Sequence, residues 1–246
     1  MNLLKCILTN NDCYKSNKKI TPKGVMVHST GVNNKTLKRY VQPSKNDENY
    51  NMIKERIGTN LYNNDWNRSG LDVCVHGFIG TLADGSIATI QTLPWNYRGW
   101  HCGDYANNTH ISFEICEDGL NDKDYFEKTY KEAVELTAML CKKYNLNPLK
   151  DGVVICHKEG YERGVASNHS DVVHWWSKFG VTMDNFRQDV KKEMEAEKVD
   201  NNIVSDWAKT AWEKAKSKGV LDGTNPKGTI TREMMAVILN ALDLLD

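Results

Sequence analysis

Three short stretches decide the fold and the chemistry of this chain: Val25-Met26-Val27-His28, Val153-Val154-Ile155-Cys156-His157 and Ser167-Asn168-His169-Ser170-Asp171. The first two are apolar, mostly β-branched runs of strand length, and each ends in a histidine. A side chain at the end of a strand can face an open cleft, because the chain leaves the sheet there. The third stretch is polar, and its imidazole and carboxylate stand two residues apart, on the same side of an extended chain.

Two histidines and one aspartate that converge from two strand ends and a loop fill three positions of a tetrahedral zinc site and leave the fourth to water. That plan is typical of a catalytic zinc site, whereas a structural site has four protein ligands. We therefore predict that His28, His157 and Asp171 hold one zinc ion. Glu159, two residues beyond His157, is an alternative to Asp171 as the third ligand.

Strand and helix patterns alternate over residues 1 to about 190. Strands are predicted at 24–28, 72–79, 86–93, 111–117 and 152–157. Asp84-Gly85 is a hairpin turn signal between the second and third of them. Apolar residues at spacings of three and four predict a long helix from about Asp124 to Tyr144, and a further helix is predicted at about 183–196. The expected fold class is α/β, with a mixed central sheet flanked by helices.

The end of the chain has a different composition. Residues 193–202 are charged and have few apolar anchors, which is typical of a linker. Two helices are predicted after it, at 205–218 and 231–242, with Ser205 and Thr231 as their N-caps. The chain therefore divides into a main domain at 1–192, a linker at 193–202 and a small helical module at 203–246. Such a module is marginal alone, so we expect it to pack on the main domain or on another copy.

Composition excludes some classes of protein. The 246 residues carry 32 Lys and Arg against 32 Asp and Glu, so no overall field attracts nucleic acid or an anionic membrane. No apolar run approaches the ~20 residues that cross a bilayer, and the N-terminus lacks the pattern of a secretory signal. We expect synthesis in a cytoplasm. The seven cysteines form no CxxC pair and are expected to be free, with Cys6 and Cys13 the first candidates for an exception.

Five segments in order carry a resemblance to a known family: VMVHST, VCVHGFIGTLADGSIATIQTLPWNYRGWHCG, NNTHISFEICED, VVICHKEG and ASNHSDVVHWW. The run resembles the zinc-dependent N-acetylmuramoyl-L-alanine amidases of type 2, the peptidoglycan-recognition type, and above all endolysins of clostridial phages and related autolysins. It covers roughly residues 20–190. The resemblance implies the fold of that family, which is a mixed sheet with a central helix packed on it and the zinc at one edge of a groove. The zinc ligands of the family correspond to His28, His157 and Asp171.

The resemblance also implies two catalytic residues. Glu114 alternates with Phe113 and Ile115, so it faces the groove if those two residues pack in the core. Many relatives have a glutamate there, which acts on the zinc-bound water and passes its proton to the leaving nitrogen. His169 stands two residues before the aspartate ligand, where relatives often have lysine, and would stabilise the oxyanion of the tetrahedral intermediate.

Three further residues are expected along the substrate groove, namely His76, Trp100 and His101. Each of the two histidines has packing in the protein interior as its alternative. Some relatives place a tyrosine beside the equivalent of His76. Here the neighbour is Val75, so Glu114 carries the predicted proton transfer.

The implied reaction is hydrolysis of the amide between the lactyl group of N-acetylmuramic acid and L-alanine of the peptidoglycan stem peptide. The implied role is that of a phage endolysin that degrades the bacterial cell wall after release from the host cytoplasm. A host autolysin, a recycling amidase and a non-catalytic peptidoglycan-binding protein are the alternatives. The module at 203–246 loosely resembles S-layer-homology-like and endolysin tail units, which implies cell-wall binding or homo-oligomer formation. Neither nucleic acid nor stable membrane insertion is expected.

Overall fold

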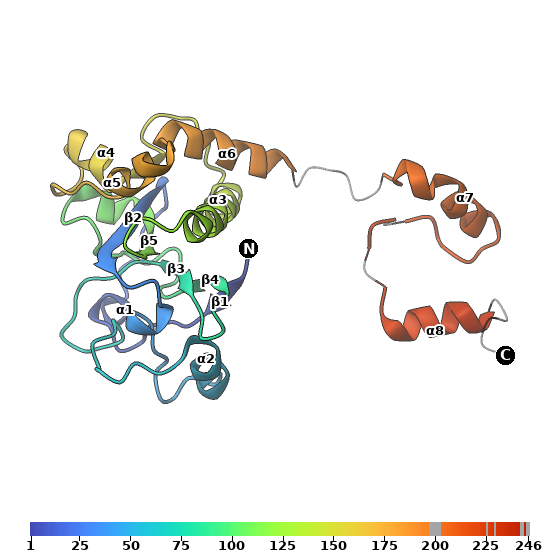
Figure 1. Ribbon diagram of the computed structural model, residues 1–246, viewed down its shortest axis with the longest axis horizontal. Helices are drawn as coiled ribbons and strands as arrows, with labels where there is room; N and C mark the ends of the chain where they lie inside the picture. Colours follow the sequence, from blue (N-terminus) through green and yellow to red (C-terminus); the bar gives the residue numbers. More distant parts are fainter. Residues whose placement is uncertain (197–202, 225, 229, 242–243, 245–246) are drawn as a thin grey trace. The chain divides into compact units, whose positions relative to one another are not determined.

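The computed structural model describes residues 1–196, 203–224, 226–228, 230–241 and 244. The chain divides into two compact units, Met1–Met194 and Glu195–Asp246. The first unit is built around one sheet with helices on both of its faces, and the second contains helices (Figure 1).

The sheet of the first unit has six strands in the order β1-β4-β3-β5-β2-β6. Their bounds are β1 Leu3–Lys5, β2 Gly24–Asn33, β3 Gly77–Thr81, β4 Ile87–Gln91, β5 His110–Glu117 and β6 Val154–Cys156. Only the β3–β4 pair among these strands is antiparallel, and the other four pairings are parallel. The predicted mixed sheet is therefore confirmed. The strand β1 was not predicted, because its three residues are too few for a periodic pattern.

One face of the sheet packs against α3 (Lys123–Tyr144), α5 (Val173–Trp176) and α6 (Met183–Ala196). The helix α3 begins where the Asp122 carboxylate accepts the Tyr125 N–H and ends at Asn145, which adopts the left-handed conformation. Its apolar stripe, with Leu136 and Leu140 fully buried, lies against Val27 and Phe113 of the sheet. The predicted helix at 124–144 is confirmed.

The opposite face is covered in two parts. Toward β3 and β4, the cover is η1 (Leu37–Arg39) and α2 (Tyr50–Ile57), and toward β2 and β6 it is the segment that contains η2 (Tyr105–Asn108). The remaining elements of this unit are α1 (Asp12–Ser16), α4 (His157–Glu162) and η3 (Ser177–Phe179). The two covers leave the carboxyl ends of β2, β5 and β6 accessible from this face, where the predicted site residues lie.

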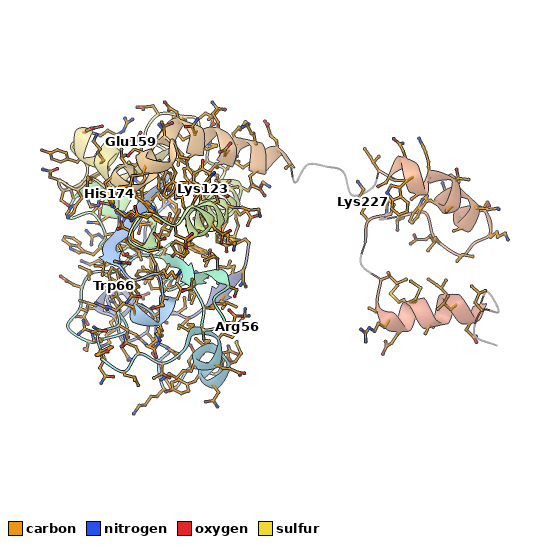
Figure 2. The ribbon with its side chains drawn as sticks, viewed as in Figure 1. Arg56, Trp66, Lys123, Glu159, His174 and Lys227 are labelled. Carbon is orange, nitrogen blue, oxygen red and sulfur yellow. A yellow bond between two sulfur atoms is a disulfide. The ribbon has the colours of Figure 1, made fainter. Side chains whose placement is uncertain are left out.

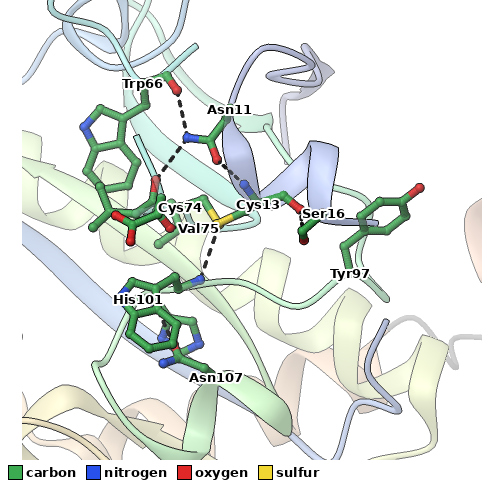
Figure 3. Close-up of a disulfide and its surroundings, with 12 residues drawn as sticks. Asn11, Cys13, Ser16, Trp66, Cys74, Val75, Tyr97, His101 and Asn107 are labelled. Atoms are coloured by element: carbon green, nitrogen blue, oxygen red, sulfur yellow. Dashed lines mark hydrogen bonds between the residues drawn. A yellow bond between two sulfur atoms is a disulfide. The ribbon is translucent and has the colours of Figure 1, made fainter. Parts of the chain in front are cut away.

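A disulfide joins Cys13 of α1 to Cys74, with their Cα atoms 6.5 Å apart (Figure 3). The expectation that every cysteine is free is therefore wrong for this pair. The other five cysteines are free and buried, as expected. The pair stands 61 residues apart in the sequence, and no local pattern reports a contact over that separation.

Reduction of the Cys13–Cys74 disulfide is expected to lower the free energy of unfolding by about 2–4 kcal/mol, because a closed loop of this size restricts the unfolded chain. The measurement is urea unfolding of the wild-type chain with and without dithiothreitol. The Cys13→Ala, Cys74→Ala double variant is the control, and its stability should not respond to the reductant. An equal loss of stability in both proteins would show that dithiothreitol does not act through this disulfide.

The second unit contains η4 (Asp206–Ala208), α7 (Lys209–Ser217) and α8 (Arg232–Ala241), close to the two helices predicted there. Asp222 closes the loop between them by accepting both the N–H and the hydroxyl of Thr224. The predicted linker at 193–202 begins inside α6, and its residues 197–202 lie outside the described residues. Within the described part of the chain, every helix is too short or too polar to cross a membrane.

Candidate active site

Three neighbouring strands place a row of functional side chains on one face of the sheet. His28 of β2 is the register partner of Glu114 of β5. On the other side of β2, Val27 pairs with Cys156, so His157 follows one residue later, at the start of α4. Side chains alternate between faces along a strand, so all three lie opposite to the face covered by α3. Ligand sites of open sheets with parallel strands form at such carboxyl ends.

The strand β2 does not end at His28, as the sequence had suggested, but continues to Asn33. Its pairing with β5 is interrupted between Ser29 and Asn33. The chain therefore leaves the regular ladder after Ser29, and Thr30 and Gly31 line the cleft in front of the sheet.

Asp171 joins the two histidines from the loop after α4. His28 Nδ1 lies 3.1 Å from His157 Nδ1 and 3.1 Å from Asp171 Oδ2, and His157 Nδ1 lies 3.4 Å from Asp171 Oδ1. These donor atoms all lie within 4.8 Å of one another. Ligands on a tetrahedral ion with bonds of about 2.0 Å are about 3.3 Å apart, so the three residues fit a zinc ion. Two imidazole nitrogens and a carboxylate are a donor set that suits such an ion.

The loop around Asp171 is tied to the rest of the unit by its backbone and its neighbours. The Asp171 carbonyl accepts the Lys158 N–H at 3.2 Å, and the Ser167 N–H donates to the Cys102 carbonyl at 2.8 Å. Directly after the loop, Trp175 and Trp176 are fully buried against α3 and α6. The position of the carboxylate is therefore set by packing as well as by its two histidine partners.

The pKa values of Asp171 and His28 are strongly shifted. Burial alone would raise the pKa of Asp171, but the hydrogen bonds from His157 and His28 outweigh it and hold the pKa far below its usual value. Burial lowers the pKa of His28 against the opposing attraction of the Asp171 carboxylate. An ionised aspartate and a neutral imidazole are the forms that bind a metal.

Glu114 lies beside this centre, as the register partner of His28 on the neighbouring strand. Its Oε2 is buried and has no hydrogen-bond partner among the described residues, and its side chain lines the cleft. Burial raises the pKa of Glu114 well above its usual value, and the charges of Asp171 and Glu117 raise it further. Buried, unpaired and perturbed carboxylates of this kind are candidates for general acid–base catalysis.

His169 also lines the cleft, from the exposed side of the Asp171 loop. Its ring packs on His157 with the centroids 4.5 Å apart, and its Nδ1 lies 3.3 Å from Ser167 Oγ. The structure thus places the residue over the row of donors, where an N–H can reach a group bound in the cleft.

The cleft has a volume of about 490 Å³. Its walls include both polar and aromatic side chains, and Trp66 and His174 come from separate parts of the first unit (Figure 2). Trp100 and His101 also line it. The sequence had assigned no role to Trp66, because a lone tryptophan in a polar loop carries no local signal of the cleft that it reaches.

His76 is not in the cleft, so its assignment to the substrate groove is wrong. Its side chain is fully buried. Its Nδ1 accepts the Ser112 N–H at 3.0 Å, and its Nε2–H donates to the Tyr97 carbonyl at 2.8 Å. His76 therefore connects the segment before β3 to Ser112 and Tyr97. This is the alternative role, packing in the protein interior.

His76 predicts a pH dependence of stability. Burial lowers its pKa to about 4, so the unfolded chain takes up a proton at higher pH than the folded chain does. Stability is therefore full above about pH 6.5 and falls as the pH drops toward 4, by about 3 kcal/mol from this residue. The measurement is the free energy of unfolding at pH 7 and pH 4.5. A His76→Gln variant, less stable throughout, should lose less between the two pH values, and an equal loss would contradict the assignment.

Glu159 does not replace Asp171 as a ligand. Its carboxylate pairs with Arg187 of α6 at 2.9 Å and approaches the Cys156 N–H at the start of α4. Glu117, which the sequence places in a solvated acidic patch, is instead buried and accepts hydrogen bonds from Ser29 at 2.7 Å and from His174 at 3.0 Å. This second carboxylate connects Ser29 of β2 to His174 of α5 beside the cleft.

Comparisons with known proteins identify the family and the fold of the chain. The sequence model of one family, described as N-acetylmuramoyl-L-alanine amidase, matches residues 17–174. The hydrolase AmiA of Staphylococcus aureus, solved in complex with its ligand, has a TM-score of 0.55 and 16% identity over 79% of this chain and 83% of its own. The PlyG catalytic domain has a TM-score of 0.50 and 21% identity over 79% of this chain and 96% of its own. At such identities the two structures show a shared fold. No curated protein matches the chain.

Proposed function

This chain is an enzyme that belongs to the N-acetylmuramoyl-L-alanine amidase family, and we propose that it hydrolyses the amide between the lactyl group of N-acetylmuramic acid and L-alanine in peptidoglycan. One observation carries the proposal. The donor atoms of His28, His157 and Asp171 converge in a cleft that also contains the buried carboxylate of Glu114. That combination is what metal-assisted hydrolysis of an unactivated amide requires.

A zinc ion held by His28, His157 and Asp171 would supply a Lewis acid that acidifies water and polarises the amide carbonyl. The three residues match the ion in charge as well as in spacing, since two neutral imidazoles and one carboxylate leave it with a net positive charge. Ser167 supports this arrangement, because its Oγ lies 3.2 Å from His157 Nε2 and orients the ring from behind.

Glu114 is proposed to take a proton from the attacking water and to deliver it to the leaving nitrogen of L-alanine. Its raised pKa favours return of the proton, and its Oε2, which has no partner in the described part of the chain, can bind the water. His169 is proposed to donate a hydrogen bond to the oxygen of the tetrahedral intermediate. Its exposed ring above His157 supports that role.

Mass spectrometry of digested cell walls tests the reaction. The expected products are stem peptides with new L-alanine amino termini and intact glycan strands. New reducing sugars would instead identify a glycosidase, and cuts within the stem peptide would identify a peptidase. An unchanged wall that nevertheless binds the protein would favour the non-catalytic alternative.

We further propose that the protein acts on polymeric wall, as an endolysin or an autolysin does, rather than on small recycled fragments. An open cleft with aromatic walls supports a long substrate that continues beyond the reacting bond. The comparison is the rate on intact sacculi against the rate on a soluble muramoyl peptide. A strong preference for the soluble peptide would favour a recycling enzyme.

The second unit is proposed to bind the cell wall or to form a homo-oligomer. Its helices expose apolar side chains, among them Trp207 and Val237, which are 90% and 69% exposed. Removal of residues 200–246 separates the two roles. Loss of wall binding with retained cleavage of soluble substrate indicates targeting. A change from an oligomer to a monomer in solution indicates assembly.

A further inference from the structure

His101 contacts the proposed metal centre from behind, through His28. Its Nδ1 lies 2.9 Å from His28 Nε2, whereas His28 Nδ1 is the atom that faces His157 and Asp171. The two rings meet edge to face with their centroids 5.1 Å apart. His28 is therefore held on both sides, with the metal-facing donors at one ring nitrogen and His101 at the other.

The two imidazoles fix the positions of each other's protons. A metal ion at His28 Nδ1 needs that nitrogen unprotonated, so the proton of the neutral ring is on Nε2. The Nε2–H then donates to His101 Nδ1, which must carry no proton itself. The proton of neutral His101 is consequently on Nε2, an atom that is buried and has no hydrogen-bond partner in the described structure.

His101 is itself held in place by contacts outside the loop that carries Asp171. Its backbone N–H donates to Oδ1 of the fully buried Asn107 at 2.7 Å (Figure 3). The preceding residue, Trp100, donates its N–H to the Cys74 carbonyl at 3.1 Å, and Cys74 is bonded to Cys13. The acceptor for His28 therefore sits on a segment fixed at two adjacent residues.

We propose that His101 is a positioning residue that holds the His28 ring in the orientation and tautomer in which Nδ1 is free for the metal. The inference rests on the proposed zinc site and extends it. An acceptor behind a metal-binding imidazole raises the basicity of the ring and removes the need to reorient it on binding. His101 thus contributes to metal affinity without touching the metal.

Two substitutions separate this role from simple packing. His101→Leu removes the acceptor and keeps an apolar side chain of moderate size. His101→Asn places an amide oxygen close to the position of Nδ1 and restores an acceptor. Zinc affinity of the full-length chain is measured by competition with a chromophoric chelator. We expect binding about 10–100-fold weaker in the leucine variant and within about threefold of wild type in the asparagine variant.

Nitrogen-15 spectra of the histidine rings give a readout that is independent of activity. In the zinc-loaded wild type, we expect the proton of His28 on Nε2 and the proton of His101 on Nε2. A proton on His101 Nδ1, or equal zinc affinity in the leucine variant and the wild type, would overturn the proposal. If the leucine variant does not fold, the asparagine variant and the wild-type spectrum still decide. A wild type that binds no zinc would refute the metal site itself. Tight zinc binding in the wild type with the same affinity in the leucine variant would refute only the role of His101.

Discussion

Replacement of Asp171 by alanine is expected to abolish zinc binding and to reduce amide hydrolysis at least about a thousandfold. The carboxylate is the only charged member of the donor set, and both histidines lose their shared partner when it is removed. Zinc affinity should fall by more than the 10–100-fold that loss of an outer partner costs. The measurements are zinc content after dialysis and the initial rate on purified walls.

Asp151→Ala is the matched control for this variant. Asp151 is an exposed carboxylate paired with Arg163 at 2.7 Å, at the edge of the same unit. It lies outside the cleft lining, so zinc binding and rate should stay at the wild-type level. Full lytic activity of the Asp171→Ala protein would refute the zinc mechanism proposed here.

Replacement of Glu114 by glutamine is expected to lower kcat by about 10²–10⁴-fold, because the amide cannot carry the proton. Zinc affinity and KM should change little, since the side chain keeps its shape and is not one of the three donors. Steady-state kinetics on a soluble muramoyl peptide, with zinc bound, separate these parameters. Glu162→Gln, on the exposed side of α4, is the control that removes a carboxylate without altering the cleft.

The same variant has an expected effect on stability without metal. The raised pKa of Glu114 means that the folded protein holds the proton to higher pH than the unfolded chain does. Metal-free wild type therefore loses stability as the pH rises from the unfolded-state value near 4.3 through the folded-state pKa. Metal-free Glu114→Gln lacks this loss and should be the more stable protein at pH 8. The measurement is the free energy of unfolding of both metal-free proteins against pH. Equal pH dependence would show that the pKa of Glu114 is not raised in the folded protein, whatever the effect of the substitution on kcat.

The sequence predicted the parts of the fold that depend on local pattern. Apolar β-branched runs marked β2 and β6, and spacings of three and four marked α3, because each depends on which side of one element is buried. The alternation of Glu114 with Phe113 and Ile115 predicted the face on which the carboxylate lies. The structure brings the donor atoms of His28, His157 and Asp171 together, which spacing suggested and could not show.

The features that the sequence missed depend on contacts between distant residues. The Cys13–Cys74 disulfide and the Glu159–Arg187 ion pair each join two segments that are distant in the sequence. No local sequence pattern in either segment indicates the contact. His76 and His101 look alike in sequence, as histidines beside apolar residues. One is buried with both nitrogens bonded to neighbours, and the other lines the cleft behind His28. Only the course of the chain distinguishes them.

The pairing of His28 with Glu114 on adjacent parallel strands also determines how the site fails on heating. Backbone hydrogen bonds of the sheet fix the spacing of these two residues, so it persists until the first unit unfolds as a whole. Asp171 and His169 lie instead on a loop that can open at a smaller free-energy cost. Thermal inactivation should therefore begin with separation of the loop from an intact sheet, and tighter anchoring of residues 167–171 is the more effective route to a heat-resistant enzyme.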